Sequence, residues 1–263
     1  MECKNCFLTL QTHHNFCPHC GAKVIRKRLT IKALFSHFSE QFLNYDNKFL
    51  QTFIGLFKQP EAVIGCYVNG TRKKYVNVIS YFAIALTLSG FQMFIFNKFF
   101  PELMNIDFLT QSGTEEFQKE NMNFVQEYQS IIYMLIVPVY ALVSKIVFFD
   151  FKQFNYTEHL VLNMYLAAHL SIVSTILVLT TSLFGFNFNM VGLFLIPLQI
   201  LFSAYCFKRV FDLNIKTILL KTIFFVLILT ILFVIFSVLT AIMMYYNGTL
   251  DKINAAKKAA TGS

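Results

Sequence analysis

The sequence predicts an all-α membrane protein, in which about five transmembrane helices follow a small four-cysteine zinc ribbon and cytoplasmic amphipathic helices. Hydrophobic residues make up 56% of the 263 residues and charged residues only 14%, which leaves too little polar surface for a soluble domain of this length. Four of the six cysteines form two C-x-x-C pairs near the N-terminus. Between these pairs and the first long apolar run, apolar residues recur at helical spacing in short segments.

The cysteine pairs are Cys3 with Cys6 and Cys17 with Cys20, separated by ten residues. Each C-x-x-C turn can present two thiolates, and two such turns close a tetrahedral zinc site. A redox dithiol and a chance cluster are the alternatives, but a redox C-x-x-C normally belongs to a βαβ context that is not evident here. The segment is too short to bury a core, so we expect the zinc to be structural and to supply most of the folding free energy.

Three histidines near these pairs are candidate replacement ligands, although exposed loop positions explain them more simply: His13, His14 and His19.

The chain divides into four parts by composition. Residues 1–24 form the predicted zinc ribbon, and residues 25–75 the amphipathic interfacial helices. Residues 76–246 form the five-span bundle, and residues 247–263 a flexible tail of mostly small and polar residues.

Three short helices are expected between the ribbon and the bundle. Thr30 caps the first, Asp46 or Asn47 caps the second, and Pro60 begins a third that ends at Asn69-Gly70, where glycine can adopt the left-handed conformation that terminates a helix. These helices are too short and too polar to cross a bilayer. Their phenylalanine stripes favour an interfacial layer at the headgroups, and a small helical core packed against itself is the alternative.

The membrane junction comprises Arg72, Lys73, Lys74 and Tyr75. Three cations immediately before an apolar run are typical of its cytoplasmic end, and a tyrosine there suits the membrane interface. This junction therefore predicts which way the chain faces.

The apolar runs that follow predict five spans, at Val76–Asn97, Ile131–Phe149, His159–Phe184, Met190–Phe207 and Thr217–Tyr246. When the connections alternate between the two sides, 17 of the 22 Lys and Arg residues fall on the side of the N-terminus. The positive-inside rule then predicts a cytoplasmic N-terminus and a C-terminus outside.

Four polar residues within the spans form a candidate intramembrane site: His169, Gln199, Tyr140 and Gln92. His169 falls near the middle of the third span, where an ionisable side chain is expensive and often functional. A proton or substrate path through these residues is one interpretation. A neutral histidine that hydrogen-bonds a neighbouring helix is the other. The sequence contains no catalytic pattern that predicts an enzyme.

The order of features resembles an uncharacterised bacterial family of zinc-ribbon, multi-span inner-membrane proteins with a domain of unknown function. The resemblance rests on Cys17-Pro-His-Cys20-Gly21 and on Pro60 followed by Tyr67-x-x-Gly70-x-Arg72-Lys73-Lys74-Tyr75, and it covers roughly the first hundred residues. It implies zinc at the four cysteines and a location in the inner (plasma) membrane, and it supplies no activity. Five spans with a cytoplasmic N-terminus are also similar in topology alone to Yip-type membrane-trafficking proteins.

We therefore expect a non-enzymatic membrane scaffold or complex subunit whose zinc-stapled cytoplasmic head docks a partner protein. Membrane lipids are the other expected partners. Nucleic acid is not expected, because the positive-inside rule and anionic lipid explain the basic head. The alternative is a small transporter or lipid-handling protein with a polar intramembrane site around His169, for which a cavity lined by His169, Gln199 and Tyr140 is the expected sign. An intramembrane enzyme is a third hypothesis.

Overall fold

The computed structural model describes residues 2–22, 24, 48–71, 73–104, 128–151, 154–186 and 188–248. The chain separates into two compact units, Met1–Asn47 and Lys48–Ser263, and each is considered by itself. The helix expected after Thr30, the junction residue Arg72 and the tail from residue 249 onward lie outside the described residues.

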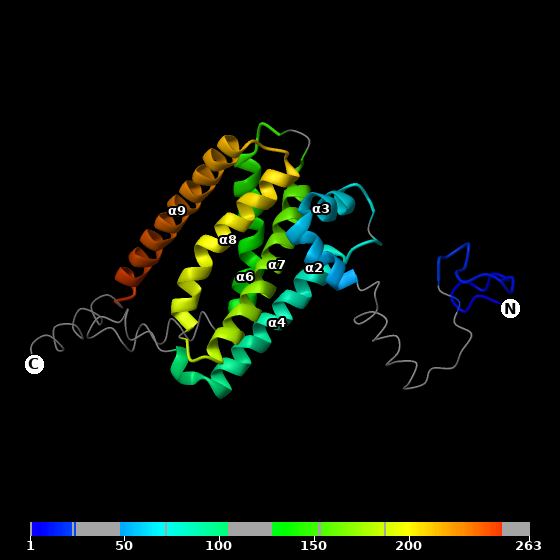
Figure 1. The fold of residues 1–263 in the computed structure, drawn as a ribbon, viewed down its shortest axis with the longest axis horizontal. Helices are drawn as coiled ribbons and strands as arrows, with labels where there is room; N and C mark the ends of the chain where they lie inside the picture. Colours follow the sequence, from blue (N-terminus) through cyan, green and yellow to red (C-terminus); the bar gives the residue numbers. More distant parts are fainter. Residues whose placement is uncertain are drawn as a thin grey trace, which may run out of the picture. The chain divides into compact units, whose positions relative to one another are not determined.

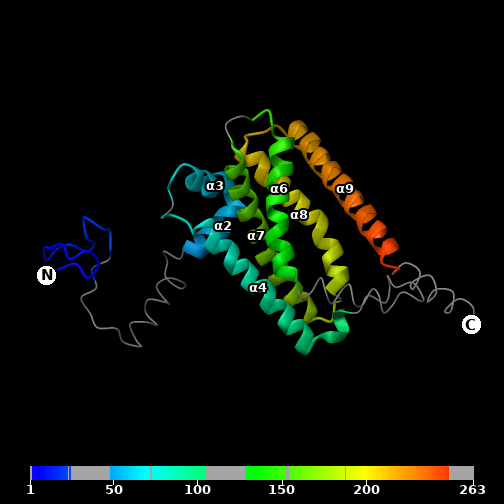
Figure 2. The same ribbon diagram turned by 180° about the vertical axis from the view of Figure 1, so that it is seen from behind.

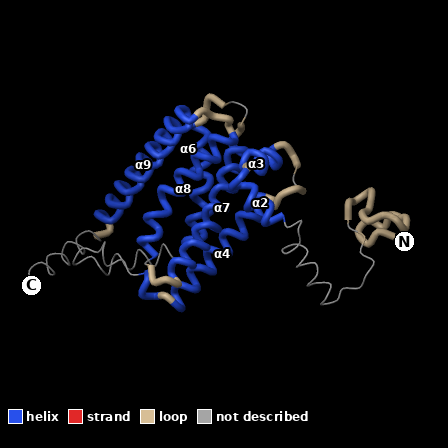
Figure 3. The backbone as a smooth tube through the Cα atoms, viewed as in Figure 1, coloured by secondary structure: helices blue, strands red, loops and turns tan. Residues whose placement is uncertain are grey.

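The first unit is built from turns in its described residues (Figure 3). An isolated antiparallel bridge joins Glu2 and Thr9. Its small core consists of Cys3, Leu10 and Cys17, which are almost fully buried. Two of these three residues belong to the cysteine pairs, so the pairs are part of the core rather than an addition to it.

The second unit is helical throughout its described residues (Figures 1 and 3). Its elements are α2 (Lys48–Lys58), α3 (Pro60–Val68), α4 (Val78–Phe99), the 3-10 helix η1 (Pro101–Met104), α6 (Gln129–Val147), α7 (Tyr156–Ser182), α8 (Phe188–Val210) and α9 (Ile215–Tyr246). The prediction of an all-α protein is confirmed for this unit.

Helix α7 is the centre of the bundle, and α4, α6 and α8 pack around it (Figure 1). In its apolar stretch 61% of the residues are buried, compared with 39% in α4 and none in α9. A capping box begins α7, in which the Asn155 side chain accepts from the Glu158 backbone N–H and the Glu158 carboxylate accepts from the Asn155 N–H. This reciprocal cap satisfies two of the unpaired donors at the helix start.

Four helices are long and apolar enough to cross a membrane, namely α4, α7, α8 from Met190, and α9. The chain is therefore consistent with a helical membrane protein, as predicted. The fifth expected span corresponds to α6, whose apolar stretch Ile131–Val147 is shorter. The number of five spans stays a prediction.

The end of α6, the end of α8 and the start of α9 lie at the same end of the bundle (Figure 2). Phe148, after α6, stacks against Phe207 and Phe211 at the end of α8, with ring centroids 4.9 and 4.7 Å apart. The Lys221 ammonium of α9 donates to the Asp150 carboxylate at 2.6 Å and to the Val147 carbonyl at 2.9 Å. These contacts join the end of α6, the end of α8 and the start of α9.

Helices α2 and α3 pack onto the bundle as well as onto each other. Leu56, Val63 and Ile64 are fully buried and share one core with residues of α4 and α7. Leu50 and Ile54 of α2 are 51% and 40% exposed. The pair of helices thus has one apolar side against the bundle, and α2 also carries exposed apolar side chains.

The chain turns after α3 as the sequence predicts. Helix α3 ends at Val68, and Gly70 has a φ of +87°, in the left-handed region that glycine adopts readily. Asn77 then caps α4 by accepting a hydrogen bond from the Ile79 N–H at 3.0 Å. The junction between these helices therefore has defined ends on both sides.

Candidate metal centre and intramembrane cavity

The four cysteines of the N-terminal pairs converge on one point. Their Sγ atoms all lie within 4.8 Å of one another, with Cys3 and Cys20 at 3.6 Å and Cys6 and Cys17 at 3.5 Å. A tetrahedral zinc with bonds of about 2.3 Å requires sulfur atoms about 3.8 Å apart. The cluster can therefore bind a metal ion with little rearrangement. His13, His14 and His19 do not belong to the metal-compatible group of the described residues.

Each cysteine pair lies on a tight turn closed by a backbone hydrogen bond. The Phe7 N–H donates to the Cys3 carbonyl at 2.9 Å, and the Gly21 N–H donates to the Cys17 carbonyl at 2.9 Å. The residue after the second cysteine is left-handed in both turns, with φ of +60° at Phe7 and +69° at Gly21. The two turns are thus geometrically equivalent, which is how two C-x-x-C segments present four sulfurs to one centre.

The thiol pKa values differ across the cluster. The Asn5 side chain and the Ala22 backbone lower the pKa of Cys20 to about 6. The backbone hydrogen bond of Leu8 acts in the same direction on Cys6, but burial and the three neighbouring thiols outweigh it and raise the pKa of Cys6 to about 12. Four thiolates this close repel one another, so a bound cation is required for all four to lose their protons.

Apolar side chains project from the surface of this unit. Phe7, Phe16 and Leu8 are 76%, 59% and 40% exposed. Phenylalanine is a bulky residue for which a positive φ is a genuine outlier. At Phe7 the chain therefore holds an exposed aromatic ring at a position where glycine fits better.

The four predicted intramembrane residues lie in three separate places. His169 is fully buried, with its Nδ1 3.0 Å from the Tyr81 hydroxyl. The rings of Phe53, Phe57 and Phe202 surround it at 4.9, 4.4 and 5.1 Å between centroids. Because Tyr81 belongs to the first turn of α4 and two of these rings belong to α2, His169 lies where α2 docks on the bundle, rather than in a shared polar site.

The other three residues divide between a helix contact and a cavity. Gln92 of α4 accepts a hydrogen bond from the Thr175 hydroxyl of α7 at 2.8 Å. Tyr140 of α6 and Gln199 of α8 line a cavity of about 540 Å³ between α6, α7, α8 and α9. Gln92 thus ties two helices together, whereas Tyr140 and Gln199 face open space.

The second buried histidine of the described residues, His159, is not among the sites that the sequence predicts. His159 is fully buried, and its Nδ1 lies 2.9 Å from the Ser144 hydroxyl. Asn163 donates to the same hydroxyl at 2.9 Å and to the His159 carbonyl at 2.8 Å. The signal in the sequence is the i, i+4 spacing of His159 and Asn163, which places both on one face of a helix.

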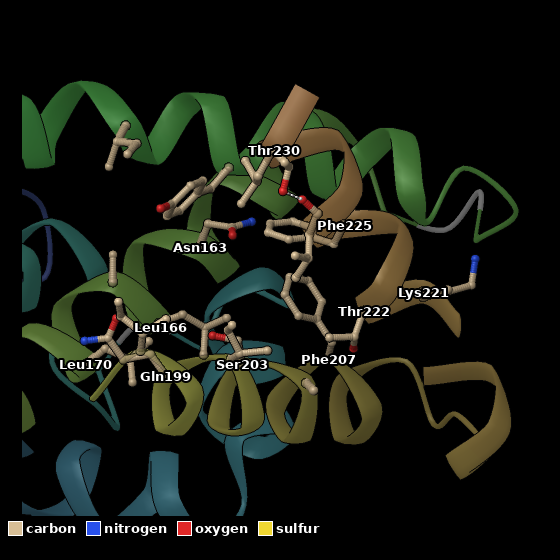
Figure 4. A pocket seen from close by; sticks show the side chains of 18 of the residues that line it. Asn163, Leu166, Leu170, Gln199, Ser203, Phe207, Lys221, Thr222, Phe225 and Thr230 are labelled. Atoms are coloured by element: carbon tan, nitrogen blue, oxygen red, sulfur yellow. Dashed lines mark hydrogen bonds between the residues drawn. The ribbon is translucent and has the colours of Figure 1, made fainter. Parts of the chain in front are cut away.

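The cavity is apolar over most of its surface (Figure 4). Gln199 and Ser203 rise from α8 into the space that Phe225 and Thr230 face from α9, and Lys221 lies at one end (Figure 4). In the part of the chain that the structure describes, Tyr140, Gln199 and Ser203 make no hydrogen bond through their side chains.

The described junction residues are consistent with a membrane boundary. Lys73 and Lys74 are exposed, and the Lys74 ammonium lies 5.3 Å from the centre of the half-buried Tyr75 ring.

The fold and these sites define the class as a helical protein with four candidate membrane spans and a four-cysteine cluster that can bind a metal ion. Residues 46–90 match a family described as "Protein of unknown function (DUF3667)". The match covers α2, α3, the junction and the first half of α4. The cysteine cluster lies outside the matched residues. No curated protein and no solved structure matches the chain.

Proposed function

We propose that this chain is a non-enzymatic scaffold or complex subunit of the inner membrane, whose zinc-bound cytoplasmic head docks a partner protein. The observation that carries the proposal is Phe7. Its aromatic side chain is 76% exposed, and its backbone is in the left-handed conformation. A non-glycine residue in this conformation costs about 1–2 kcal/mol. Strain of this kind tends to persist where it serves function.

The equivalent turn supplies the comparison. Gly21 occupies the same position after Cys20 that Phe7 occupies after Cys6, and it has a similar φ. The second turn thus has the same backbone conformation with glycine at this position, so the geometry of the cluster does not require the phenylalanine. An exposed aromatic anchor on a rigid turn is typical of a binding hot spot.

The charge of the head favours a protein over the membrane as the partner of this surface. Residues 1–22, the part of the head with the cysteines and Phe7, contain one glutamate and one lysine, Glu2 and Lys4. This part therefore carries no net charge apart from its histidines and thiols. Attraction to anionic lipid depends on clusters of Lys and Arg. Those clusters lie further along the chain, at the linker from residue 23 and at the junction.

Zinc is the metal that suits this ligand set best. Soft thiolates in a tetrahedral arrangement favour zinc over hard cations, and four protein ligands leave no open position for catalysis. When bound, zinc holds the two turns together and so keeps the Phe7 side chain in place. The role proposed for the metal is therefore structural.

Metal analysis of the purified full chain tests the first step. One zinc per chain is expected, and Cys17→Ser is expected to lower the zinc content and expose the head to protease without changing membrane insertion. Cys66→Ser is the matched control, because Cys66 lies outside the cluster. Metal far below one equivalent, with the four cysteines freely alkylated in the native chain, would overturn the zinc assignment.

Comparative capture tests the docking step. The native chain and Phe7→Gly are recovered from mildly solubilised membranes, and the proteins that accompany each are compared. We expect Phe7→Gly to retain its zinc and lose a partner that the native chain retains. An identical set of partners would contradict docking through Phe7. Loss of binding to pure lipid vesicles, instead of to a protein, would reassign this surface to the membrane.

A further inference from the structure

We propose that the cavity between α6, α7, α8 and α9 binds a membrane lipid with an uncharged, hydrogen-bonding headgroup. The site is independent of the docking head, since all of its lining residues belong to the second unit.

The loose packing of α9 makes the cavity accessible from the bilayer. Helix α9 lies against α6 and α8 (Figures 1 and 2), yet Ile218 is its one buried residue. Phe225 and Leu229 are partly buried, while Phe233 is 70% exposed. A hydrocarbon chain can therefore enter beside α9 without passing through water.

Polar side chains inside the cavity point to a ligand that forms hydrogen bonds. Gln199 and Ser203 are one turn apart on α8, and Tyr140 faces the same cavity from α6. None of the three side chains has a hydrogen-bond partner among the described residues. In hydrocarbon no water is available to satisfy them, so each is costly when left alone. A headgroup with hydroxyl, ester or carbonyl groups provides both donors and acceptors for these three side chains.

The charges around the cavity exclude a phosphate as the preferred headgroup. Among the described residues that line it, Lys221 is the one with a charge. The Lys221 ammonium already donates to the Asp150 carboxylate and to the Val147 carbonyl, so its charge is neutralised within the protein. A buried phosphate without a free cation is strongly disfavoured, whereas an uncharged headgroup requires no counter-ion.

Size and lining fit one chain with a small headgroup. A volume of about 540 Å³ lies in the range of about 300–1,000 Å³ for small-molecule sites. Leu166, Phe207, Phe225 and Leu229 supply apolar surface for the chain. A monoacylglycerol, with one acyl chain and an uncharged glycerol headgroup, is the probe that these features select.

The absence of tryptophan from the sequence permits a direct test by fluorescence quenching. A single tryptophan replaces Phe225 in the cavity, and the full chain is placed in phosphatidylcholine nanodiscs that contain increasing brominated monoacylglycerol. Phe91→Trp is the matched control, because Phe91 is 56% exposed on the outer surface of α4. We expect the fluorescence of Phe225→Trp to be half quenched at a mole fraction of brominated monoacylglycerol about tenfold lower than the one needed for Phe91→Trp.

Removal of the polar groups should abolish this preference. Gln199→Leu combined with Ser203→Ala in the Phe225→Trp chain is expected to raise the half-quenching mole fraction to that of Phe91→Trp. Thr180→Val is the control, since the exposed Thr180 hydroxyl donates to the Ile176 carbonyl of its own helix. Thr180→Val in the Phe225→Trp chain is expected to leave the half-quenching mole fraction unchanged.

Three outcomes would overturn the proposal. Equal quenching of Phe225→Trp and Phe91→Trp, each in the otherwise unchanged chain, would exclude a lipid site in the cavity. This result does not depend on whether the Gln199 and Ser203 variants fold. Preferential quenching of Phe225→Trp by brominated phosphatidylglycerol would exclude an uncharged headgroup. Unchanged quenching after Gln199 and Ser203 are replaced would exclude recognition by these side chains.

Discussion

At the scale of single residues, the two cysteine turns show the same backbone with different side chains. Phe7 and Gly21 both follow the second cysteine of a pair, and both have a positive φ. Glycine adopts this conformation without penalty, whereas phenylalanine does so at a cost of about 1–2 kcal/mol. The free energy of folding of the head therefore contains a local penalty that the metal site itself does not require.

Relief of this strain gives a prediction whose sign is unusual. Phe7→Gly should stabilise the metal-bound head by about 1 kcal/mol, measured as a higher chelator concentration for half-maximal zinc release. Phe16→Gly is the matched control, because Phe16 is also exposed but is not among the residues with positive φ. Glycine should destabilise the head there by about 0.5–1 kcal/mol. Destabilisation by both changes would show that Phe7 carries no strain.

At the scale of elements, α2 and α3 pack closely because one position has no side chain. A Cβ added at Gly55 of α2 would lie 2.8 Å from the Val63 Cγ2 of α3 and 3.6 Å from the Tyr75 ring. Val63 is fully buried, so it has little space into which to move. This contact also fixes α2 where Phe53 and Phe57 meet His169. Helix α2 is therefore held by its contacts rather than by its own helical stability, which is small for 11 residues.

Alanine substitutions at two glycines should separate packing from helix propensity. Gly55→Ala gains about 1 kcal/mol of propensity, but overpacking against Val63 costs about 1–3 kcal/mol, so we expect a net loss of thermal stability in detergent. Gly65→Ala in α3 meets nothing within 4 Å and should stabilise the protein by about 0.5–1 kcal/mol.

A second substitution checks the mechanism. Val63→Ala combined with Gly55→Ala should recover part of the lost stability, because the shorter side chain makes room for the new methyl group. Equal stabilisation by Gly55→Ala and Gly65→Ala would contradict the close approach of α2 and α3.

At the scale of the whole second unit, the direction of the helices supports five crossings. Tyr81 of α4 contacts His169 of α7, and Gln92 of α4 contacts Thr175 further along α7, so the two helices run parallel. The chain must therefore return between them. Helix α6 is the described element that does so, since its Ser144 meets His159 near the start of α7. This connectivity is consistent with α6 as a fifth span, which stays a prediction.

Reporter fusions test this topology. A reporter after Tyr246 should be active only outside, and one after Phe154, between α6 and α7, should be active only in the cytoplasm. Both expectations follow from five alternating spans with the cationic connections inside. The opposite pair of results, with Phe154 outside and Tyr246 inside, would mean that α6 does not cross and that the chain has four spans.

The sequence by itself determined the class of fold and the four cysteines that can bind a metal ion. The long apolar stretches, the left-handed Gly70 and the two cysteine turns all depend on residues close together in the chain, and local spacing is sufficient to predict them. The convergence of the four sulfurs agrees with the zinc-site spacing of the two pairs and not with separate redox dithiols.

Only the tertiary structure decided which polar residues share a site. Helices α4, α7, α8 and α9 are apolar on nearly every side, so their periodicity does not indicate which face meets a neighbour. Rotation of each helix about its own axis is set by packing against distant segments. For this reason His169 lies against α2, Gln92 accepts a hydrogen bond from α7, and Tyr140 and Gln199 face a cavity. In the sequence, all four lie at comparable positions within apolar runs.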